Sequence, residues 1–294
     1  MNKNLIVSLA LVGASSVAQS AVFVGAHADD IELFMSQNML GDLRGQAPTV
    51  FIVGTAGDAG AGKGEGSNIY SNSYGAVRSA AHVAAVRFAM SQSGARVPQT
   101  VASTESMGGK TINVLTVGNV KFYNLMLPDG NFGGTGYPST GNQSLSYLNT
   151  GRISTITSLD NLNTRYTLPE LRATLRDIVT KNMRGIPTVW VNLQDDASGT
   201  NPSDHSDHTT LSRITQDALA SNTCVHRALF VDYDTANRPV NLNANQINDG
   251  FAVFGTLNAY LVNQGNPSTY DGGHTQWLSR QYYRTVHGTG SCNF

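Results

Sequence analysis

Charged residues are scarce in this 294-residue chain and make up only 13% of it. The 19 lysines and arginines nearly balance the 20 aspartates and glutamates, and no long run of either sign occurs. Nucleic acids and anionic membrane surfaces are bound through concentrated positive charge, which this chain does not have. We therefore expect neither of them as a partner.

Long apolar runs are also missing, apart from one near the N-terminus. LIVSLALVGASSVA follows Lys3 and precedes the small residues of AQSA. The run is short for a membrane-spanning helix, and the whole pattern is typical of a signal peptide. We interpret residues 1–20 as a signal peptide and residues 21–294 as a secreted or periplasmic domain with no membrane span. An uncleaved anchor or a first core element are the alternatives.

Cysteines are rare as well, with only Cys224 and Cys292 in the chain. In an oxidising compartment they can form one disulfide, which would constrain the unfolded chain by roughly 4 kcal/mol. We expect this bridge because Cys292 lies in a polar tail that has little else to hold it. Two unpaired thiols are the alternative.

Apolar runs alternate with helical patterns, and no internal repeat or linker divides the chain. Such alternation indicates βαβ units, hence a single three-layer α/β domain with a mostly parallel sheet. The polar segment 131–165 is expected to run over the surface. The expected strands are 21–26, 49–56, 120–127, 188–194 and 227–234, and the expected helices are 31–43, 168–183, 208–220, 246–263 and one that starts near Tyr74 with Val77, Ala80, Ala84 and Phe88 inward.

Two clusters of histidine and aspartate each follow a strand and open a helix. Capping of that helix explains one carboxylate in a cluster, but it does not explain the histidines. The carboxyl ends of parallel strands meet at one edge of a sheet, where ligands bind. We therefore expect the clusters to converge on a metal ion. They are AHADD with His27, Asp29 and Asp30, and SDHSDH with His205, Asp207 and His208.

GAHADDIEL and HSDH together resemble the LmbE/PIG-L family of N-acetylglucosaminyl de-N-acetylases, whose usual signatures read AHPDD and HPDH. VGTAGDAG, SYGAVRSAAHVAA and LMLPDG resemble further family segments in the same order, across about residues 22–215. The resemblance implies a Rossmann-like fold, a single zinc ion, and removal of acetyl from an N-acetylated amino sugar or glycoconjugate. Fe²⁺ accepts the same nitrogen and oxygen ligands.

The resemblance also implies roles for eight residues. A zinc ion with three protein ligands keeps a position open for chemistry, and an adjacent carboxylate outside the ligand set can move protons. The implied metal ligands are His27, Asp30 and His208, the general base is Asp29, His205 stands near the scissile carbonyl, Asp207 orients His205, and Arg78 and Asp129 contact the substrate.

Four departures from the family pattern leave this metal set intact but weaken any specific substrate assignment. Ala28 and Ser206 replace prolines, Ala81 replaces an acidic residue, and Ser203 stands where some relatives have tyrosine. Hydrolysis of a non-sugar amide, or glycan binding around a structural metal without catalysis, remain alternative functions.

Other motifs have less specific interpretations. GDAGAGKG begins like a phosphate-binding loop, but Gly64 stands where serine or threonine is needed, so we expect a loop at the rim of the substrate cleft. His82 is expected to have a packing or surface role, and His226 begins a strand. His274 and His287 are expected in solvent, with a position in the cleft as the alternative. Trp277, Tyr282 and Tyr283 are expected to pack the tail onto the domain, and stacking against a sugar is the alternative.

Overall fold

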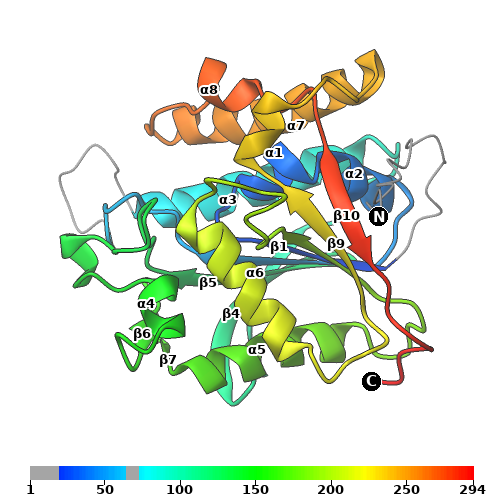
Figure 1. Cartoon of the computed structure of the whole chain (residues 1–294). Helices are drawn as coiled ribbons and strands as arrows, with labels where there is room; N and C mark the ends of the chain where they lie inside the picture. The colour runs from blue at the N-terminus through cyan, green and yellow to red at the C-terminus, as the bar shows by residue number, and fades with distance from the viewer. Residues whose placement is uncertain (1–19, 64–72) are drawn as a thin grey trace, which may run out of the picture.

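A computed structural model of the chain describes residues 20–63 and 73–294. The signal-peptide prediction lies outside the described residues, except for Ser20. One mostly parallel sheet of eight strands crosses the molecule, with helices on both faces (Figure 1). Its five parallel strands, in spatial order, are β9 (His226–Val231), β8 (Trp190–Gln194), β1 (Ala21–Gly25), β2 (Thr49–Thr55) and β5 (Val120–Leu127).

Three further strands make the sheet mixed, and the sequence analysis missed all of them. β3 and β4 form a hairpin beyond β5, and β10 pairs antiparallel with β9 at the other edge. Gly108 and Gly109 both have positive φ, as the tight turn of this hairpin requires. The hairpin strands lack long apolar runs, because they carry threonine, serine and asparagine. The three strands are β3 (Thr100–Met107), β4 (Lys110–Val117) and β10 (Tyr282–Val286).

The helices divide between the two faces, and each face has its own hydrophobic cluster. β1 lies between β2 and β8 in the sheet, so the order of the strands reverses at β1. Such a switch point opens a crevice beyond the carboxyl ends of the two strands. One face carries α1 (Asp30–Phe34), α2 (Ser36–Arg44), α3 (Tyr74–Ser91) and α7 (Ala244–Asn263), and the other carries α4 (Leu145–Asn149), α5 (Leu168–Asn182) and α6 (Ser206–Ala218) (Figure 1).

Two helix predictions need correction. The helix expected over 31–43 is broken at Met35, whose φ of −121° separates α1 from α2. On α3 the expected inward face is only partly right. Val77 is buried and the half-buried Phe88 packs against the core, but Ala80 and Ala84 are only half-buried. The helix lies between the sheet and α7, so it buries a broader surface centred on other residues. The fully buried positions of α3 include Ala81, His82, Ala85, Val86 and Ala89.

Segment 131–165 is not the purely superficial excursion that was expected. It contains η1 (Pro138–Thr140), α4 and the two-stranded pair β6 (Ile156–Thr157) and β7 (Arg165–Tyr166). These short elements carry isolated apolar side chains into the core on the α5–α6 face. Isolated positions show no periodicity, so the sequence pattern hides them. The buried residues are Leu145, Leu148, Ile156 and Tyr166.

A disulfide and an ion pair are among the contacts that hold the C-terminal tail on the domain. Cys224 and Cys292 form the expected disulfide, which links residues 68 positions apart. Arg284 of β10 donates two hydrogen bonds to the buried carboxylate of Asp195, at 2.7 and 2.8 Å. No helix within residues 20–63 and 73–294 is long and apolar enough to cross a membrane.

A buried polar pair joins α1 to α3. His82 Nδ1 lies 2.6 Å from Glu32 Oε1, and neither residue is exposed to solvent. The imidazole packs edge-on against Phe51 and Phe122, with ring centroids 5.1 and 5.6 Å away. This histidine therefore has a packing role, and its partner is a carboxyl group with no access to water.

We expect His82→Ala to lower the free energy of unfolding by about 3 kcal/mol, because it leaves the Glu32 carboxyl buried without its partner. Urea denaturation measures this change, and His287→Ala at an exposed position is the control. The double change Glu32→Leu with His82→Leu should recover most of the loss, since a buried pair is often replaceable by apolar side chains. A loss below about 1 kcal/mol for His82→Ala would contradict the argument.

Candidate functional site

The first cluster is shaped by the tight turn between β1 and α1. A Cβ at Gly25 would lie 3.1 Å from the His27 carbonyl oxygen and 3.3 Å from Asp30 Cβ, so the turn leaves little room for a side chain there. Asp30 Oδ2 accepts hydrogen bonds from the His27 backbone N–H at 2.7 Å and from Gln194 Nε2 at 3.0 Å. Both bonds use the same oxygen, which leaves Oδ1 to face the imidazoles.

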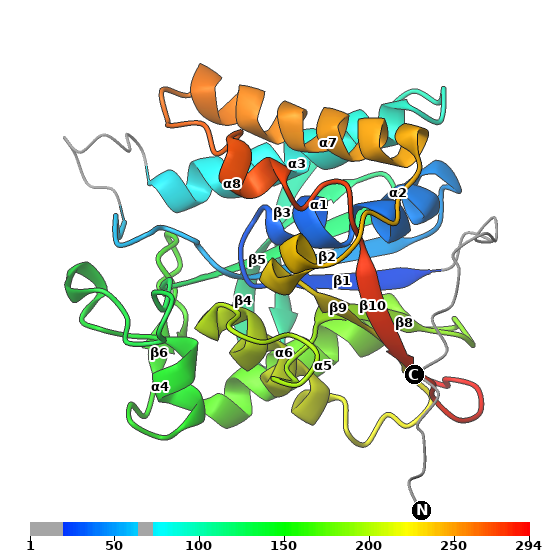
Figure 2. The same cartoon turned by 45° about the horizontal axis from the view of Figure 1, so that its top comes forward.

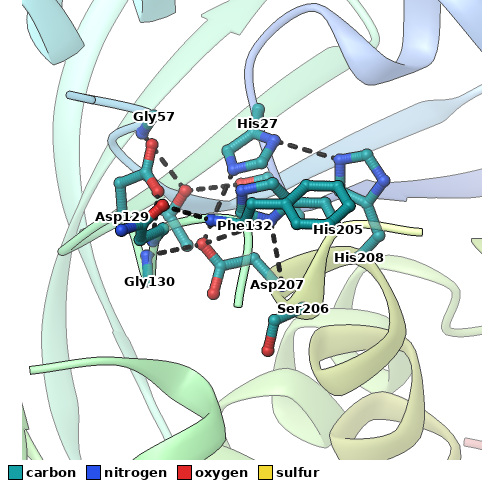
Figure 3. A network of polar contacts seen from close by, with 12 residues as sticks. His27, Gly57, Asp129, Gly130, Phe132, His205, Ser206, Asp207 and His208 are labelled. Carbon is teal, nitrogen blue, oxygen red and sulfur yellow. Dashed lines mark hydrogen bonds and ion pairs between the residues drawn. The ribbon is translucent and has the colours of Figure 1, made fainter. Parts of the chain in front are cut away.

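The three predicted metal ligands lie together. His27 Nδ1 is 3.1 Å from His208 Nε2, and Asp30 Oδ1 is 3.6 Å from the first nitrogen and 3.2 Å from the second. Figure 3 shows the two imidazoles facing one another. A tetrahedral zinc ion with bonds of 2.0–2.1 Å places its ligands about 3.3 Å apart. The gap between His27 Nδ1 and His208 Nε2 has room for at most one hydrogen atom. The two nitrogens therefore cannot both carry a proton on these facing sides, whereas both can bind one metal ion.

Other combinations of donor atoms are also close. Those of His27, His205 and His208 lie within 4.8 Å of one another, as do those of His27, Asp129, His205 and Asp207. Those of Asp204, His208 and Asp232 form a third such group. In the predicted triad of His27, Asp30 and His208, no pair of facing atoms is further apart than 3.6 Å. We refer to this predicted triad as the candidate metal centre.

Carboxylates lie behind both imidazoles of the triad. His208 Nδ1 is 2.9 Å from Asp204 Oδ1 and 3.1 Å from Asp232 Oδ2, and His27 Nε2 is 3.5 Å from Asp207 Oδ2. Such partners orient a ligating imidazole and strengthen it as a donor. The sequence analysis missed Asp204 and Asp232. Two features of the sequence could have pointed to them. Asp204 lies four residues before His208, and Asp232 directly follows the strand β9.

Asp207 differs from its expected task. Its carboxylate is 4.0 Å from His205 Nδ1, whereas its backbone N–H donates to that nitrogen at 3.1 Å. His205 is the N-cap residue of α6, so its ring accepts from the first turn of the helix. The Asp207 carboxylate instead accepts the Gly130 N–H at 2.7 Å and faces His27 (Figure 3).

The electrostatics of the site favour positive charge on the triad. Burial alone would lower the pKa of His27, but Asp30 and Asp207 outweigh it and raise that pKa to about 10. Burial likewise opposes charge on His208, yet Asp204 and Asp30 raise the pKa of His208 well above its usual value. A bound divalent cation would draw on the same carboxylates in place of these protons.

His205 stays neutral in this environment. Burial, together with the positive charge of His27 and His208, lowers the pKa of His205 to about 3. Its Nδ1 accepts a hydrogen bond, so the single ring proton sits on Nε2. His205 can therefore donate one hydrogen bond from Nε2 while its ring is neutral.

A cavity of about 190 Å³ lies beside the triad. Six of the eight predicted site residues line it. Two of them, His27 and Asp30, belong to the triad, and the others are Asp29, Arg78, Asp129 and His205. Arg78 was expected to contact substrate, and in the structure its guanidinium forms an ion pair with Asp29 and donates to the Gly57 carbonyl oxygen at 2.6 Å. Arg78 thus holds the proposed base in position. A Cβ at Gly57 would collide with this guanidinium.

The glycine-rich loop does not form a phosphate cradle. Its Ala59 N–H donates to Asp129 at 3.2 Å and its Gly62 N–H donates to Asp58 at 2.7 Å, so these groups are already used by carboxylates. Ala59 lines the cavity, as expected of a loop at its rim. Residues 64–72, the continuation of this motif, lie outside the described residues.

The cavity also has residues that the sequence analysis did not assign to a site. Tyr74 comes from the start of α3, and the others come from the C-terminal third of the chain. His274 and Trp277 had been given solvent and packing roles, because no periodicity or motif connects the tail to the two clusters. These additional lining residues are Tyr74, Tyr233, Thr269, His274 and Trp277.

No protein-family model matches this chain, and a comparison with curated proteins finds no significant match. The family resemblance therefore depends on the quoted motifs and on the geometry that they adopt.

We expect Asp207→Asn to lower the affinity for Zn²⁺ by about 10- to 100-fold, because the carboxylate supports His27. Chelator-competition titration measures this affinity. His205→Ala is the matched variant and should leave the affinity nearly unchanged, since His205 is outside the triad. If His205→Ala weakens binding as strongly as His208→Ala, the ligand set is His27, His205 and His208 instead.

Proposed function

We propose that the protein is a zinc-dependent hydrolase that removes acetyl from an N-acetylated amino sugar or glycoconjugate. The observation that carries this proposal is the position of Asp29 and His205, two groups outside the metal triad that line the cavity next to it. A structural metal site needs neither group, whereas amide hydrolysis needs a proton carrier and an oxyanion donor. The proposal includes a Rossmann-like fold of the LmbE/PIG-L type.

A zinc ion, when bound, supplies a Lewis acid and lowers the pKa of water to about 7. Asp29 accepts a proton from the attacking water as the new C–O bond forms. It then returns that proton to the amine nitrogen as the C–N bond breaks, so acetate and a free amine leave. Arg78 keeps Asp29 aimed at the cavity through their ion pair.

His205 acts on the carbonyl oxygen. Its Nε2–H can donate a hydrogen bond where negative charge develops, and such donors contribute about 3 to 4 kcal/mol to transition-state stabilisation. The helix cap at Nδ1 fixes the ring, so little reorganisation is needed. Asp129 holds the loop opposite through the N–H groups of Asn131 and Ala59, at 2.8 and 3.2 Å.

We also propose that the protein acts outside the cytoplasm. The disulfide between Cys224 and Cys292 is compatible with an oxidising compartment, and the N-terminal pattern is typical of export.

Acetate release distinguishes this function from its alternatives. N-acetylated amino sugars should release acetate, and chelation should abolish the release until zinc is restored. Faster release from simple amides than from any amino sugar would favour a non-sugar amide hydrolase. Glycan binding without release under any condition would favour a binding protein with a structural metal.

We expect Asp29→Asn to retain zinc but to lose turnover by a factor of about 10² to 10⁴, because the amide cannot carry the proton. Metal analysis and acetate release measure the two quantities. Asp249→Asn is the control, since Asp249 pairs with Arg44 at the surface. Full activity of Asp29→Asn would mean that another group is the base.

A further inference from the structure

The C-terminal segment 265–281 forms one wall of the cavity. Thr269, His274 and Trp277 line it from this side, together with Tyr233 of η2 (Tyr233–Asn237). Figure 2 shows the short helix α8 (Gly272–Thr275) beside α7, above the strands that carry the metal centre. The motifs that carry the family resemblance span about residues 22–215, so this wall lies outside them.

The aromatic rings of the wall are held in fixed orientations. Trp277 and Tyr233 stack with centroids 4.9 Å apart and planes 8° apart, and Trp277 Nε1 donates to the Tyr233 carbonyl oxygen at 3.2 Å. Phe34 supports the stack, with its centroid 5.2 Å from that of Trp277. Because the indole N–H is already satisfied, the wall offers a mainly apolar surface to the cavity.

A further aromatic ring lies next to the reacting groups. The Phe132 ring is parallel to Tyr233 within 5° at a centroid distance of 6.4 Å, and it is 5.8 Å from the His205 ring. Phe132 is 54% exposed, which is unusual for so large an apolar side chain. The aromatic row therefore extends from Trp277 to the edge of the reaction site.

Polar groups accompany the aromatic surface. His274 Nδ1 lies 2.9 Å from Asp271 Oδ1, which leaves Nε2 for a second partner. Thr269 is fixed because its N–H donates to Asn258 Oδ1 at 2.7 Å, and Asn258 itself is buried in α7. A wall of ordered aromatic rings with a few fixed polar groups is typical of small-molecule sites.

We propose that Trp277, Tyr233 and Phe132 form a saccharide subsite, which stacks against the apolar C–H face of a pyranose ring while His274 binds a ring hydroxyl. This inference depends on the proposed function for the identity of the neighbouring reaction, but the binding itself does not require catalysis. A simple amide has no such face, so the subsite makes the cavity select amino sugars.

Fluorescence tests direct contact. The chain has only two tryptophans, and Trp190 stacks on His226 at the amino end of β8, away from the cavity. In Trp190→Phe, all tryptophan emission comes from Trp277. We expect a saturable change in emission on titration with N-acetylglucosamine or its β-1,4-linked dimer, and none with acetamide. No saturable change with any N-acetylated hexosamine, in both zinc-loaded and chelated protein, would overturn the subsite.

Kinetics test its contribution to selection. We expect Trp277→Leu to raise KM for the N-acetylated saccharide about tenfold more than KM for a simple acetamide, with a smaller change in kcat. Trp277→Phe keeps a ring and should recover part of the loss, and thermal melting checks that each variant is folded. An equal rise in KM for both substrates would mean that the wall has only a structural role, and it would overturn the proposal.

The two proposals can fail separately. An emission change without acetate release from any substrate would leave the subsite standing and refute the hydrolase. Acetate release without saccharide binding at Trp277 would support the hydrolase and refute the subsite.

Discussion

The parallel pairing of β1 with β8 is the constraint on which the site depends. The register places Ala21 beside Trp190 and Phe23 beside Asn192, so the two strands end together. Gln194 then joins both ends, because Oε1 accepts the Ala26 N–H at 3.2 Å while Nε2 donates to Asp30. A slip of one residue would turn each side chain to the opposite face and separate the triad.

Negative charge is concentrated around two imidazoles, and that charge favours a cation at this position. The carboxylates of Asp30, Asp204 and Asp207 each lie within 3.5 Å of a ring nitrogen of His27 or His208. A fourth carboxyl belongs to Asp232, and burial together with Asp204 raises the pKa of this group well above its usual value. Buried carboxylates are costly unless they are paired or bound to metal. Protons on the imidazoles or a divalent ion can both supply the charge, so metal binding and proton release are coupled.

The sequence predicts the elements that carry strong local signals. The parallel strands are continuous apolar runs, and the triad residues lie in the loop and helix segments that follow two of them, so their meeting at one sheet edge could be anticipated. Other features have no local signal. β10 and the aromatic wall lie in a polar tail, and the support of Asp207 for His27 depends on how the N-cap of α6 orients His205. The partnership of Glu32 with His82 joins helices 50 positions apart and leaves no periodic trace.

The two halves of the cavity are built from different parts of the chain, and an ion pair is among the contacts that connect them. Asp195 starts the loop after β8 that leads to Asp204 and His205. Arg284 of the tail donates two hydrogen bonds to the Asp195 carboxylate. Asn201, in the same loop, donates to Asp204 Oδ2 at 2.7 Å and accepts the Asp232 N–H at 3.1 Å. The tail that positions the aromatic wall therefore also steadies the loop that supports His208. The proposed saccharide subsite and the candidate metal triad are thus joined structurally through this loop, although their residues lie far apart in the sequence.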